Sequence, residues 1–315
     1  MTETPGLRST AVIVGDEENM LRLREDIPLW PGGRRKCCTL SFDDGTVEDV
    51  RIAQMLRDRE LRATFNLNPG LFGHSDHLEQ GTFAVEHEKL PVERIAEVYE
   101  GFELAVHGYT HAHLGRVPSS MAAYEIVRAK AELEDIVHAP VRGMAWPINF
   151  RDPDLANVRD TARACGICYG RTTRRSFDCV GMPDDWLAWD AACSYVQPEL
   201  DGVVDKFLQP VGQDGGPAYR EPYLLYVWGH GYEATGRKAW GTLEAFLDRV
   251  SGRDDVWYAS NIEVYDYAQA LRSLVYSATG DYLYNPSRLD VWMQVDGRVV
   301  HVPSGEVVTI SAWEA

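Results

Sequence analysis

The sequence of 315 residues predicts an α/β fold in which a barrel of parallel strands carries a small β appendage. Short apolar segments alternate with segments of helical periodicity along most of the chain, and this alternation is typical of a parallel sheet covered by helices. Chemically active residues directly follow four of the predicted strands, as they do at the carboxyl ends of barrel strands. An open doubly wound sheet would instead gather its site at one crevice.

Each predicted element in the first half of the chain has a local cause. Apolar residues recur at helical spacing between 47 and 56, and Asn68-Pro69-Gly70 is typical of a turn that ends a strand. A serine at 119 or 120 is a suitable N-cap for a long helix. The expected strands are 38–42, 63–67 and 102–106, and the expected helices are 47–56, 91–99 and the long helix that ends near Val137.

The second half of the barrel follows the same alternation. A short strand stops at Trp146-Pro147, and Asn261 is a plausible cap for the last helix. The segment 73–89 is polar and lacks clear periodicity, so we expect a long loop near the site. The expected strands are 143–145, 223–227 and 256–259, and the expected helices are 153–164, 240–250 and 262–274.

The last forty residues change character and predict a β appendage. Residues 291–295 and 298–302 flank Asp296-Gly297, which predicts a β-hairpin with a tight two-residue turn, and 307–310 is a possible third strand. We therefore expect an N-terminal extension packed on the barrel (1–35), a barrel (36–275) and a β appendage of the same domain (276–315).

Composition and charge limit the partners. The net charge of −17 argues against binding to nucleic acid or to an anionic membrane surface. The chain has no run of eighteen apolar residues and no basic, apolar start, so we expect no membrane span, no signal peptide and a cytoplasmic location with reduced cysteines. The appendage is a possible contact surface, so a homo-oligomer stays open.

Two motifs carry the chemistry. Ser41-Phe42-Asp43-Asp44-Gly45 places two adjacent acids after a strand, and His107-Gly108-Tyr109-Thr110-His111 places two imidazoles four positions apart. Each motif alone is ambiguous, and a metalloprotease is excluded because Gly108 stands where a zincin needs its glutamate. Together they predict metal-assisted hydrolysis, in which a carboxylate and two neutral imidazoles bind the metal and a second carboxylate acts as base.

These motifs resemble those of the polysaccharide deacetylase family, the NodB-homology domain of carbohydrate esterase family four. The resemblance covers about residues 36–272, and Leu225-Tyr226-Val227-Trp228-Gly229-His230 resembles the late motif that carries the catalytic histidine. It implies a distorted (β/α)7-type barrel. It also implies the following roles: Asp43 as general base, Asp44, His107 and His111 as metal ligands, and His230 as general acid.

Further site residues follow from the same resemblance. Asp190 is the expected partner of the acid histidine, with Asp185 as the alternative, and the backbone N–H of Ile148 is expected in the oxyanion hole. The third motif departs from the family, because Trp146-Pro147 stands where many members have an arginine before the proline. The group that orients Asp43 is therefore unassigned. Trp146, Trp228 and Tyr232 are expected to offer aromatic faces to a sugar.

The predicted function is removal of acetyl groups, N- or O-linked, from an acetylated carbohydrate by a hydrolase that binds one divalent metal ion. Zinc suits one carboxylate and two imidazoles with an open position, and cobalt, nickel or iron stay possible. One alternative is a hydrolase of ureides, imides or formamides on the same barrel. Another is a carbohydrate-binding protein without catalytic activity, which the complete set of candidate residues disfavours.

Overall fold

The central sheet is built entirely from parallel strands. In a computed structural model, which describes residues 10–16, 19–80, 83–148, 152–179, 181–210 and 222–310, β3 (Lys36–Asp43) lies between β12 (Tyr223–His230) and β4 (Thr64–Leu67). From β4 the sheet continues through β7 (Glu103–Val106), β8 (Gly143–Ala145) and β9 (Tyr169–Arg175) to β10 (Trp189–Ala191).

The sheet curves into a nearly closed barrel. Beyond β12 lies the short β11 (Cys193–Ser194), which directly follows β10 in the chain, and between the two the N–H of Ala192 donates to Tyr226 O at 2.7 Å. β13 (Val256–Tyr258) pairs with the beginning of β3. The predicted α/β barrel is therefore confirmed.

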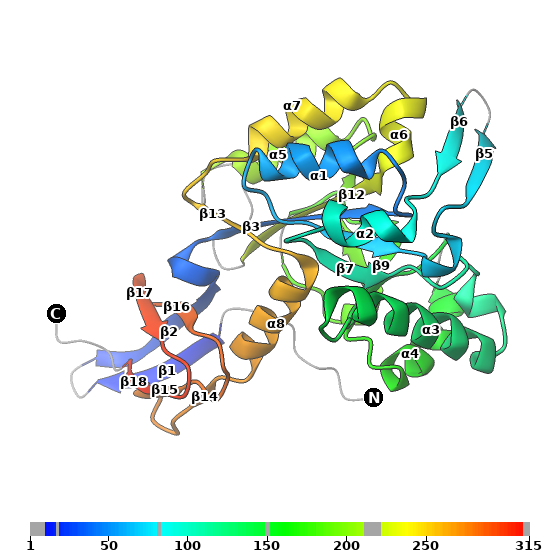
Figure 1. Ribbon diagram of the computed structural model, residues 1–315. Helices are drawn as coiled ribbons and strands as arrows, with labels where there is room; N and C mark the ends of the chain where they lie inside the picture. The colour runs from blue at the N-terminus through cyan, green and yellow to red at the C-terminus, as the bar shows by residue number, and fades with distance from the viewer. Residues whose placement is uncertain are drawn as a thin grey trace.

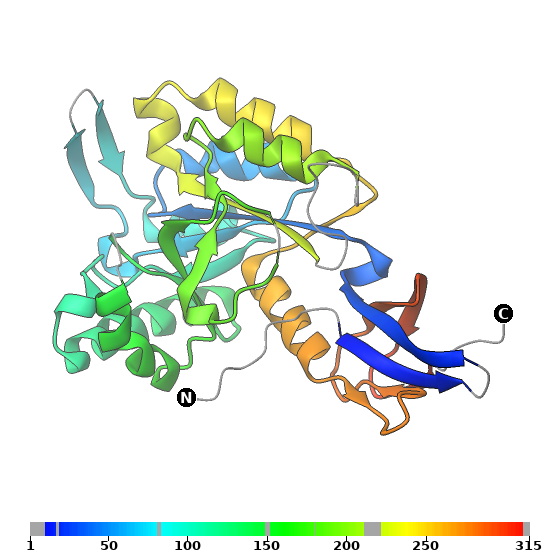
Figure 2. The same cartoon turned by 180° about the vertical axis from the view of Figure 1, so that it is seen from behind.

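Helices cover the outside of the barrel (Figures 1 and 2). α1, α5 and α7 form a layer over one side, α3 and α4 pack together on another, and α8 lies between the barrel and the appendage. β3 is buried along its whole length, as expected for a strand of a parallel sheet covered on its outer face by helices. The helices are α1 (Asp49–Arg57), α2 (Val92–Val98), α3 (Ser119–Val137), α4 (Asp152–Ala164), α5 (Leu200–Leu208), α6 (Gly231–Gly236), α7 (Trp240–Val250) and α8 (Asn261–Arg272).

The structure differs from the prediction where strands are short or polar. The expected loop at 73–89 is a hairpin of β5 (Ser75–Gln80) and β6 (Phe83–Glu88), in which Phe83 and Val85 alternate with exposed residues. β9 was not predicted, because its sequence is rich in arginine and threonine. A strand inside a barrel tolerates such side chains when they meet buried partners.

The appendage joins both ends of the chain. β1 (Thr10–Asp16) and β2 (Asn19–Leu29), expected as an extension packed on the barrel, pair with β16 (Val291–Val295) and β17 (Arg298–Val302) in a four-stranded antiparallel sheet (Figure 1). β16 and β17 confirm the predicted hairpin, and its turn has φ of 46° at Asp296 and 82° at Gly297, as a tight turn of this kind requires. A second small sheet contains β14 (Val275–Tyr276), β15 (Tyr282–Tyr284) and β18 (Val307–Thr309).

An aromatic cluster connects the appendage to the barrel. Trp30, at the junction of β2 and β3, is fully buried between Trp257 and Tyr267, with ring centroids 5.6 and 5.9 Å away. Its indole N–H donates to Tyr223 O at 2.8 Å, and the Tyr267 hydroxyl donates to Leu29 O at 2.6 Å. Across the described part of the chain, every helix is too short or too polar to span a lipid bilayer.

This cluster predicts the effect of removing Trp30. Trp30→Ala is expected to lower the free energy of unfolding by about 3–5 kcal/mol, because it deletes a buried aromatic side chain and leaves a cavity. Urea unfolding followed by far-UV circular dichroism measures this change in free energy. Tyr282→Ala, at a position that is 51% exposed, is the control and should change it by less than ~0.5 kcal/mol. Equal effects of the two changes would contradict the role assigned to Trp30.

Candidate active site

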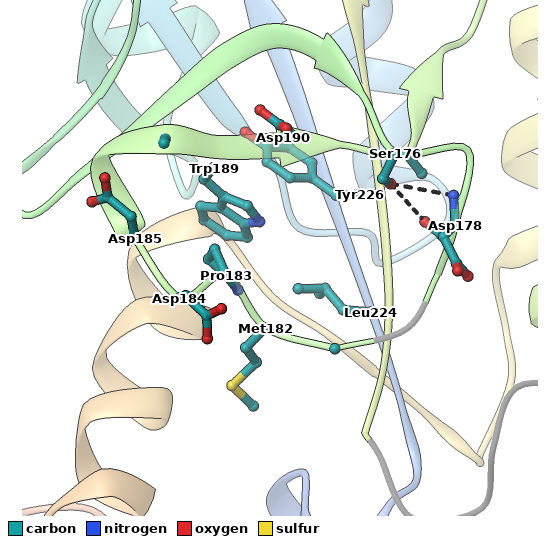
Figure 3. Close-up of a pocket in the computed structure, with 13 residues that line it drawn as sticks. Ser176, Asp178, Met182, Pro183, Asp184, Asp185, Trp189, Asp190, Leu224 and Tyr226 are labelled. Carbon is teal, nitrogen blue, oxygen red and sulfur yellow. Dashed lines mark hydrogen bonds between the residues drawn. The ribbon is translucent and has the colours of Figure 1, made fainter. Parts of the chain in front are cut away.

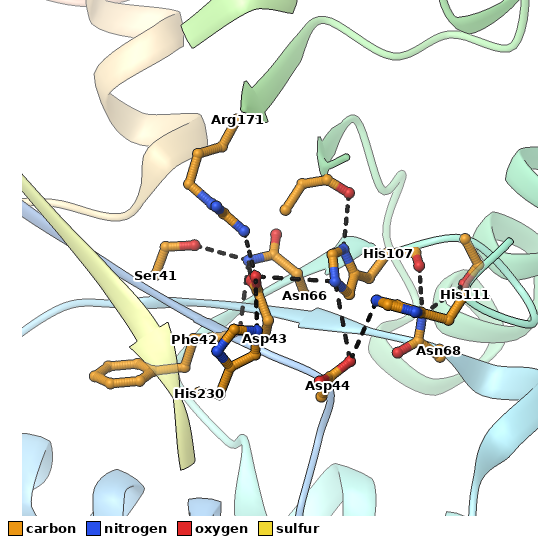
Figure 4. A network of polar contacts seen from close by, with 12 residues as sticks. Ser41, Phe42, Asp43, Asp44, Asn66, Asn68, His107, His111, Arg171 and His230 are labelled. Carbon is orange, nitrogen blue, oxygen red and sulfur yellow. Dashed lines mark hydrogen bonds and ion pairs between the residues drawn. The ribbon is translucent and has the colours of Figure 1, made fainter. Parts of the chain in front are cut away.

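Two aspartates stand at the carboxyl end of β3. Asp43 is the last residue of the strand and Asp44 begins the following turn with a φ of 81°. Asp44 N donates to Asn66 O at 2.9 Å, which fixes this turn against the neighbouring strand β4. Because the backbone changes direction at Asp44, the two adjacent carboxylates point to different partners (Figure 4).

The second motif forms a loop after β7. His107 N donates to Leu67 O at 3.0 Å, and Glu125 of α3 accepts hydrogen bonds from the N–H groups of Tyr109 and Thr110, both at 2.7 Å. Glu125 is buried, so it holds the loop from the protein interior rather than from the solvent side. The loop turns the ring of His111 toward that of His107, with centroids 4.8 Å apart.

The three predicted metal ligands converge. Asp44, His107 and His111 each offer one ligand atom, and these atoms lie within 4.8 Å of one another. Asp44 Oδ1 is 3.9 Å from His107 Nε2 and 3.8 Å from His111 Nε2. His107 Nδ1 contacts Ala145 O at 2.8 Å, an arrangement that leaves Nε2 as the free ligand atom.

The chemistry of this set fits a divalent metal ion. Burial lowers the pKa of His107, and burial together with His107 lowers the pKa of His111 to about 4, so both imidazoles are neutral at neutral pH. Burial would raise the pKa of Asp44, but Lys89 and the nearby His87 hold it well below its usual range. One anionic carboxylate and two neutral imidazoles are the donor set of a zinc site with an open position.

Asp43 is held by a residue that the sequence analysis did not identify. The guanidinium of Arg171, on β9, donates to Asp43 Oδ2, and Asn66 Nδ2 donates to Oδ1 at 2.8 Å. Both charged side chains are almost completely buried. Burial would raise the pKa of Asp43, but Arg171, followed by His107 and His230, lowers it. Arg171 thus supplies the orienting cation that the third motif lacks. Arg142, the arginine just before β8 in the region of that motif, instead pairs with Asp266 at 2.6 Å.

His230 ends β12 on the other side of Asp43. Its Nε2 is 3.9 Å from Asp43 Oδ2, and its Nδ1 is 3.0 Å from Glu233 Oε2. Burial would lower the pKa of His230, but the hydrogen bond to Glu233 and the charges of Asp44 and Asp43 raise it. Glu233 lies in the first turn of α6, so His230 and its partner belong to one capping box.

The prediction that Asp190 is the partner of His230 is therefore corrected. Asp190 lies on β10, where it accepts hydrogen bonds from Thr172 and from Arg174 Nε at 3.0 Å. It lines a separate pocket of about 240 Å³, and the alternative candidate Asp185 lines the same pocket (Figure 3). No other predicted site residue contributes to this pocket.

The aromatic residues divide into a core group and a site group. Trp146 is fully buried and donates to Leu187 O at 2.8 Å, so the prediction that it contacts substrate is corrected. Trp228 lies against the guanidinium of Arg171 at 4.2 Å and is 7% exposed. Tyr232 is partly exposed and packs on His230, with ring centroids 4.8 Å apart.

Three residues in the loops that follow β3, β7 and β8 have a strained backbone. Asp44, His111 and Ile148 all have positive φ, at 81°, 61° and 63°, which is a costly conformation for residues other than glycine. Ile148 is 45% exposed. Strained residues of this kind cluster at functional sites because the surrounding structure holds them there.

Several functional residues carried only weak signals in the sequence. Asn66 is a polar residue inside a buried strand, and Glu125 is a charge on the apolar face of α3, so each interrupts an apolar pattern. Glu233 stands three positions after His230, at the spacing of a capping box. Nothing local distinguishes Arg171 from its neighbours Arg174 and Arg175.

Comparison with family models identifies the region that carries both metal motifs. A model described as polysaccharide deacetylase matches residues 32–169. Residues 32–169 therefore resemble the polysaccharide deacetylase family, as the motifs indicated. Arg171 and His230 lie outside the matched residues. No curated protein matches the chain.

Solved structures align with the chain at low sequence identity, and one of them reaches a TM-score above 0.5. A candidate polysaccharide deacetylase from Mycobacterium smegmatis is 16% identical with a TM-score of 0.51, over 78% of this chain and 94% of that one. A deacetylase from Streptococcus pyogenes in complex with acetate is 18% identical with a TM-score of 0.39, over 48% and 61%. A CE4 family pseudoenzyme from Bacillus anthracis is 15% identical with a TM-score of 0.43, over 73% and 65%. The chain thus spans less than two thirds of the latter two proteins.

The buried pair of Asp43 and Arg171 predicts a strong energetic coupling. Arg171→Met is expected to lower the free energy of unfolding by about 3–5 kcal/mol, because it leaves the buried carboxylate of Asp43 without its charge partner. In an Asp43→Asn background the same change should cost much less, and urea unfolding of the four proteins gives the coupling. Arg174→Met, which breaks a half-exposed pair, is the control and should cost about 1 kcal/mol or less. If the effects of Arg171→Met and Asp43→Asn on the free energy of unfolding were additive, the two residues would not be paired.

Proposed function

We propose that this protein removes acetyl groups from an acetylated carbohydrate and depends on one divalent metal ion, with zinc favoured. The observation that carries the proposal is the placement of Asp43. Its carboxylate is oriented by Arg171, and its Oδ2 lies 3.8 Å from His107 Nε2 of the candidate metal site and 3.9 Å from His230 Nε2. A base, a metal-ligand set and an acid are thus gathered around one point.

The residues of the chain divide the proton transfers between them. Asp44, His107 and His111 would hold zinc, which would supply a Lewis acid for the acetyl carbonyl and for the attacking water. Asp43, kept ionised by Arg171, accepts the proton of the attacking water at a carboxylate oxygen. His230, held by Glu233, donates a proton from Nε2 to the leaving amine or alkoxide. The backbone N–H of Ile148 is the proposed oxyanion donor.

The proposed substrate is an acetylated saccharide rather than a charged polymer. The deacetylase region of the chain supports an acetylated sugar, and Tyr232 supplies a partly exposed ring beside His230 that suits a sugar face. The complete set of base, ligands and acid favours an enzyme over a carbohydrate-binding protein without activity. The net charge of −17 disfavours strongly acidic substrates.

Replacement of the base tests this function. Asp43→Asn is expected to lower acetate release from acetylated sugar oligomers at least a hundredfold, because general base catalysis is lost. Elemental analysis of the same variant should show that zinc is still bound. His111→Ala should instead lose zinc. Asp190→Asn, which removes a carboxylate outside the site, is the matched control and should stay close to wild type.

Two outcomes would contradict the assignment. If Asp43→Asn turned over substrate at the wild-type rate, Asp43 would not be the general base. Full zinc occupancy in His111→Ala would refute the proposed ligand set. A parallel panel of allantoin-like rings and formamides, followed by product release, tests the alternative amide hydrolase. Hydrolysis of the allantoin-like rings or formamides, without acetate release from the acetylated sugars, would show that the protein is the alternative amide hydrolase.

The pair of His230 and Glu233 predicts a change in pH dependence. His230 acts in its protonated form, so activity is lost as pH rises through its pKa, which Glu233 helps to raise above the ordinary value of 6.5. Glu233→Gln removes this charge, and the alkaline limb of the kcat/KM profile should move to lower pH. Glu244→Gln on α7, an exposed carboxylate that lies near Arg59, is the control. An unchanged alkaline limb in Glu233→Gln would show that another group sets it.

A further inference from the structure

A lysine reaches the candidate metal site from the end of the β5–β6 hairpin. Lys89 is 3% exposed, and its Nζ donates to the backbone O of Asp44 at 2.9 Å. The same Nζ lies 3.1 Å from Asp44 Oδ1. This is the carboxylate oxygen that faces both His107 and His111, so the ammonium contacts the atom expected to bind the metal ion.

The backbone around Lys89 is fixed beside the turn of Asp44. Lys89 N donates to His74 O at 2.9 Å, and Leu90 N donates to Gly45 O at 2.9 Å. Val47 N also donates to Glu88 O at 2.9 Å. The hairpin is therefore bonded on both sides of this lysine, and its Nζ can leave Asp44 only by a change of side-chain rotamer.

The other oxygen of Asp44 faces a nitrogen from the same segment. His87 Nε2 lies 3.4 Å from Asp44 Oδ2, and the His87 ring packs edge-on against Tyr232, with centroids 4.8 Å apart. Within the residues that the structure describes, Asp44 Oδ1 accepts no well-aligned hydrogen bond. The contact from Lys89 to this oxygen is thus mainly electrostatic and leaves its lone pairs available.

A buried ammonium in this place has two opposite effects. It stabilises the buried carboxylate of Asp44 before a metal ion binds, because an unpaired buried charge is costly. It also repels a divalent cation that binds to the same oxygen, and the buried position limits screening by salt. The first effect favours the folded protein without metal, whereas the second weakens the binding of the ion.

We propose that Lys89 is an internal counter-cation of the metal site, which neutralises Asp44 in the metal-free protein and reduces the affinity of the site for divalent cations. This inference rests on the proposed metal-dependent function, since it concerns the same ligand set. A compact amine on a flexible stem suits the role of counter-cation, because it can withdraw when the ion enters.

The experiment measures zinc affinity in the purified chain without any substrate. Chelator-treated wild type and Lys89→Met are titrated with Zn²⁺ against a chromophoric chelator. We expect Lys89→Met to bind Zn²⁺ at least tenfold more tightly, which corresponds to about 1.4 kcal/mol. In the absence of zinc the same variant should unfold at a lower temperature than wild type, and saturating zinc should raise its Tm by more than it raises that of wild type.

Matched variants separate a local charge effect from general destabilisation. Lys36, also 3% exposed, pairs with Asp255 at 3.0 Å away from the site, so Lys36→Met should lose stability without a change in zinc affinity. Lys89→Arg keeps the charge and should retain the wild-type affinity. Lys89→Gln, neutral and polar, replaces the methionine variant if that protein does not fold.

Each outcome decides between the proposals. Equal or weaker zinc binding by both Lys89→Met and Lys89→Gln overturns the inference about Lys89, and the metal site stands if wild-type binding is still lost in His111→Ala. If neither wild type nor the neutral variants bind zinc, the ligand set itself is refuted, and the proposed function falls with it. Tighter binding by the neutral variants together with a lower metal-free Tm supports the inference.

Discussion

The site depends on one electrostatic constraint, which is that two adjacent carboxylates are buried at the end of a single strand. Asp43 is 1% exposed and Asp44 is 6% exposed, so neither charge is hydrated by bulk solvent. A buried charge is tolerated only when partners compensate it. Arg171 compensates Asp43, and Lys89 compensates Asp44. Arg171 comes from another strand of the central sheet and Lys89 from a hairpin outside it, and the fold must bring both to the same strand end.

This constraint explains why elements distant in sequence are needed for one small site. β9 supplies Arg171 from two strands beyond β7, while the β5–β6 hairpin supplies Lys89 from outside the sheet. β12 supplies His230 from the neighbouring position on the other side of β3. A nearly closed parallel barrel is suited to this task, because the carboxyl ends of all its strands surround one opening. The positive φ values at Asp44 and His111 are the local strain that the surrounding contacts sustain.

The residues that were predictable from sequence are those that share a short segment. Asp43 and Asp44 are adjacent, and His107 and His111 lie in one five-residue loop, so their spacing alone indicated their chemistry. The ion pair of Asp43 spans 128 residues, and its arginine lies in a polar strand with no apolar alternation, so no local pattern pointed to it. The error at Asp190 has another cause. A distant partner was expected for His230, whereas Glu233 lies within the same helical turn, and α6 itself had not been predicted.

The arginine that holds Asp43 comes from the strand next to the one that carries the third motif. β8 and β9 are parallel, and their register places Arg171 opposite Ala145, directly before Trp146 where many family members have their arginine. An arginine one strand farther along therefore reaches the same carboxylate. The indole ring of Trp146 needs space beside β9, and Gly170 provides it, since a Cβ at that position would lie 2.5 Å from Trp146 Nε1. Trp146 N then donates to Arg171 O at 2.9 Å, so the large residue of one strand fixes the backbone of the charged residue on the next. The requirement to hold Asp43 is thus met by a pair of strands rather than by a single motif, and a search for the motif alone does not find it.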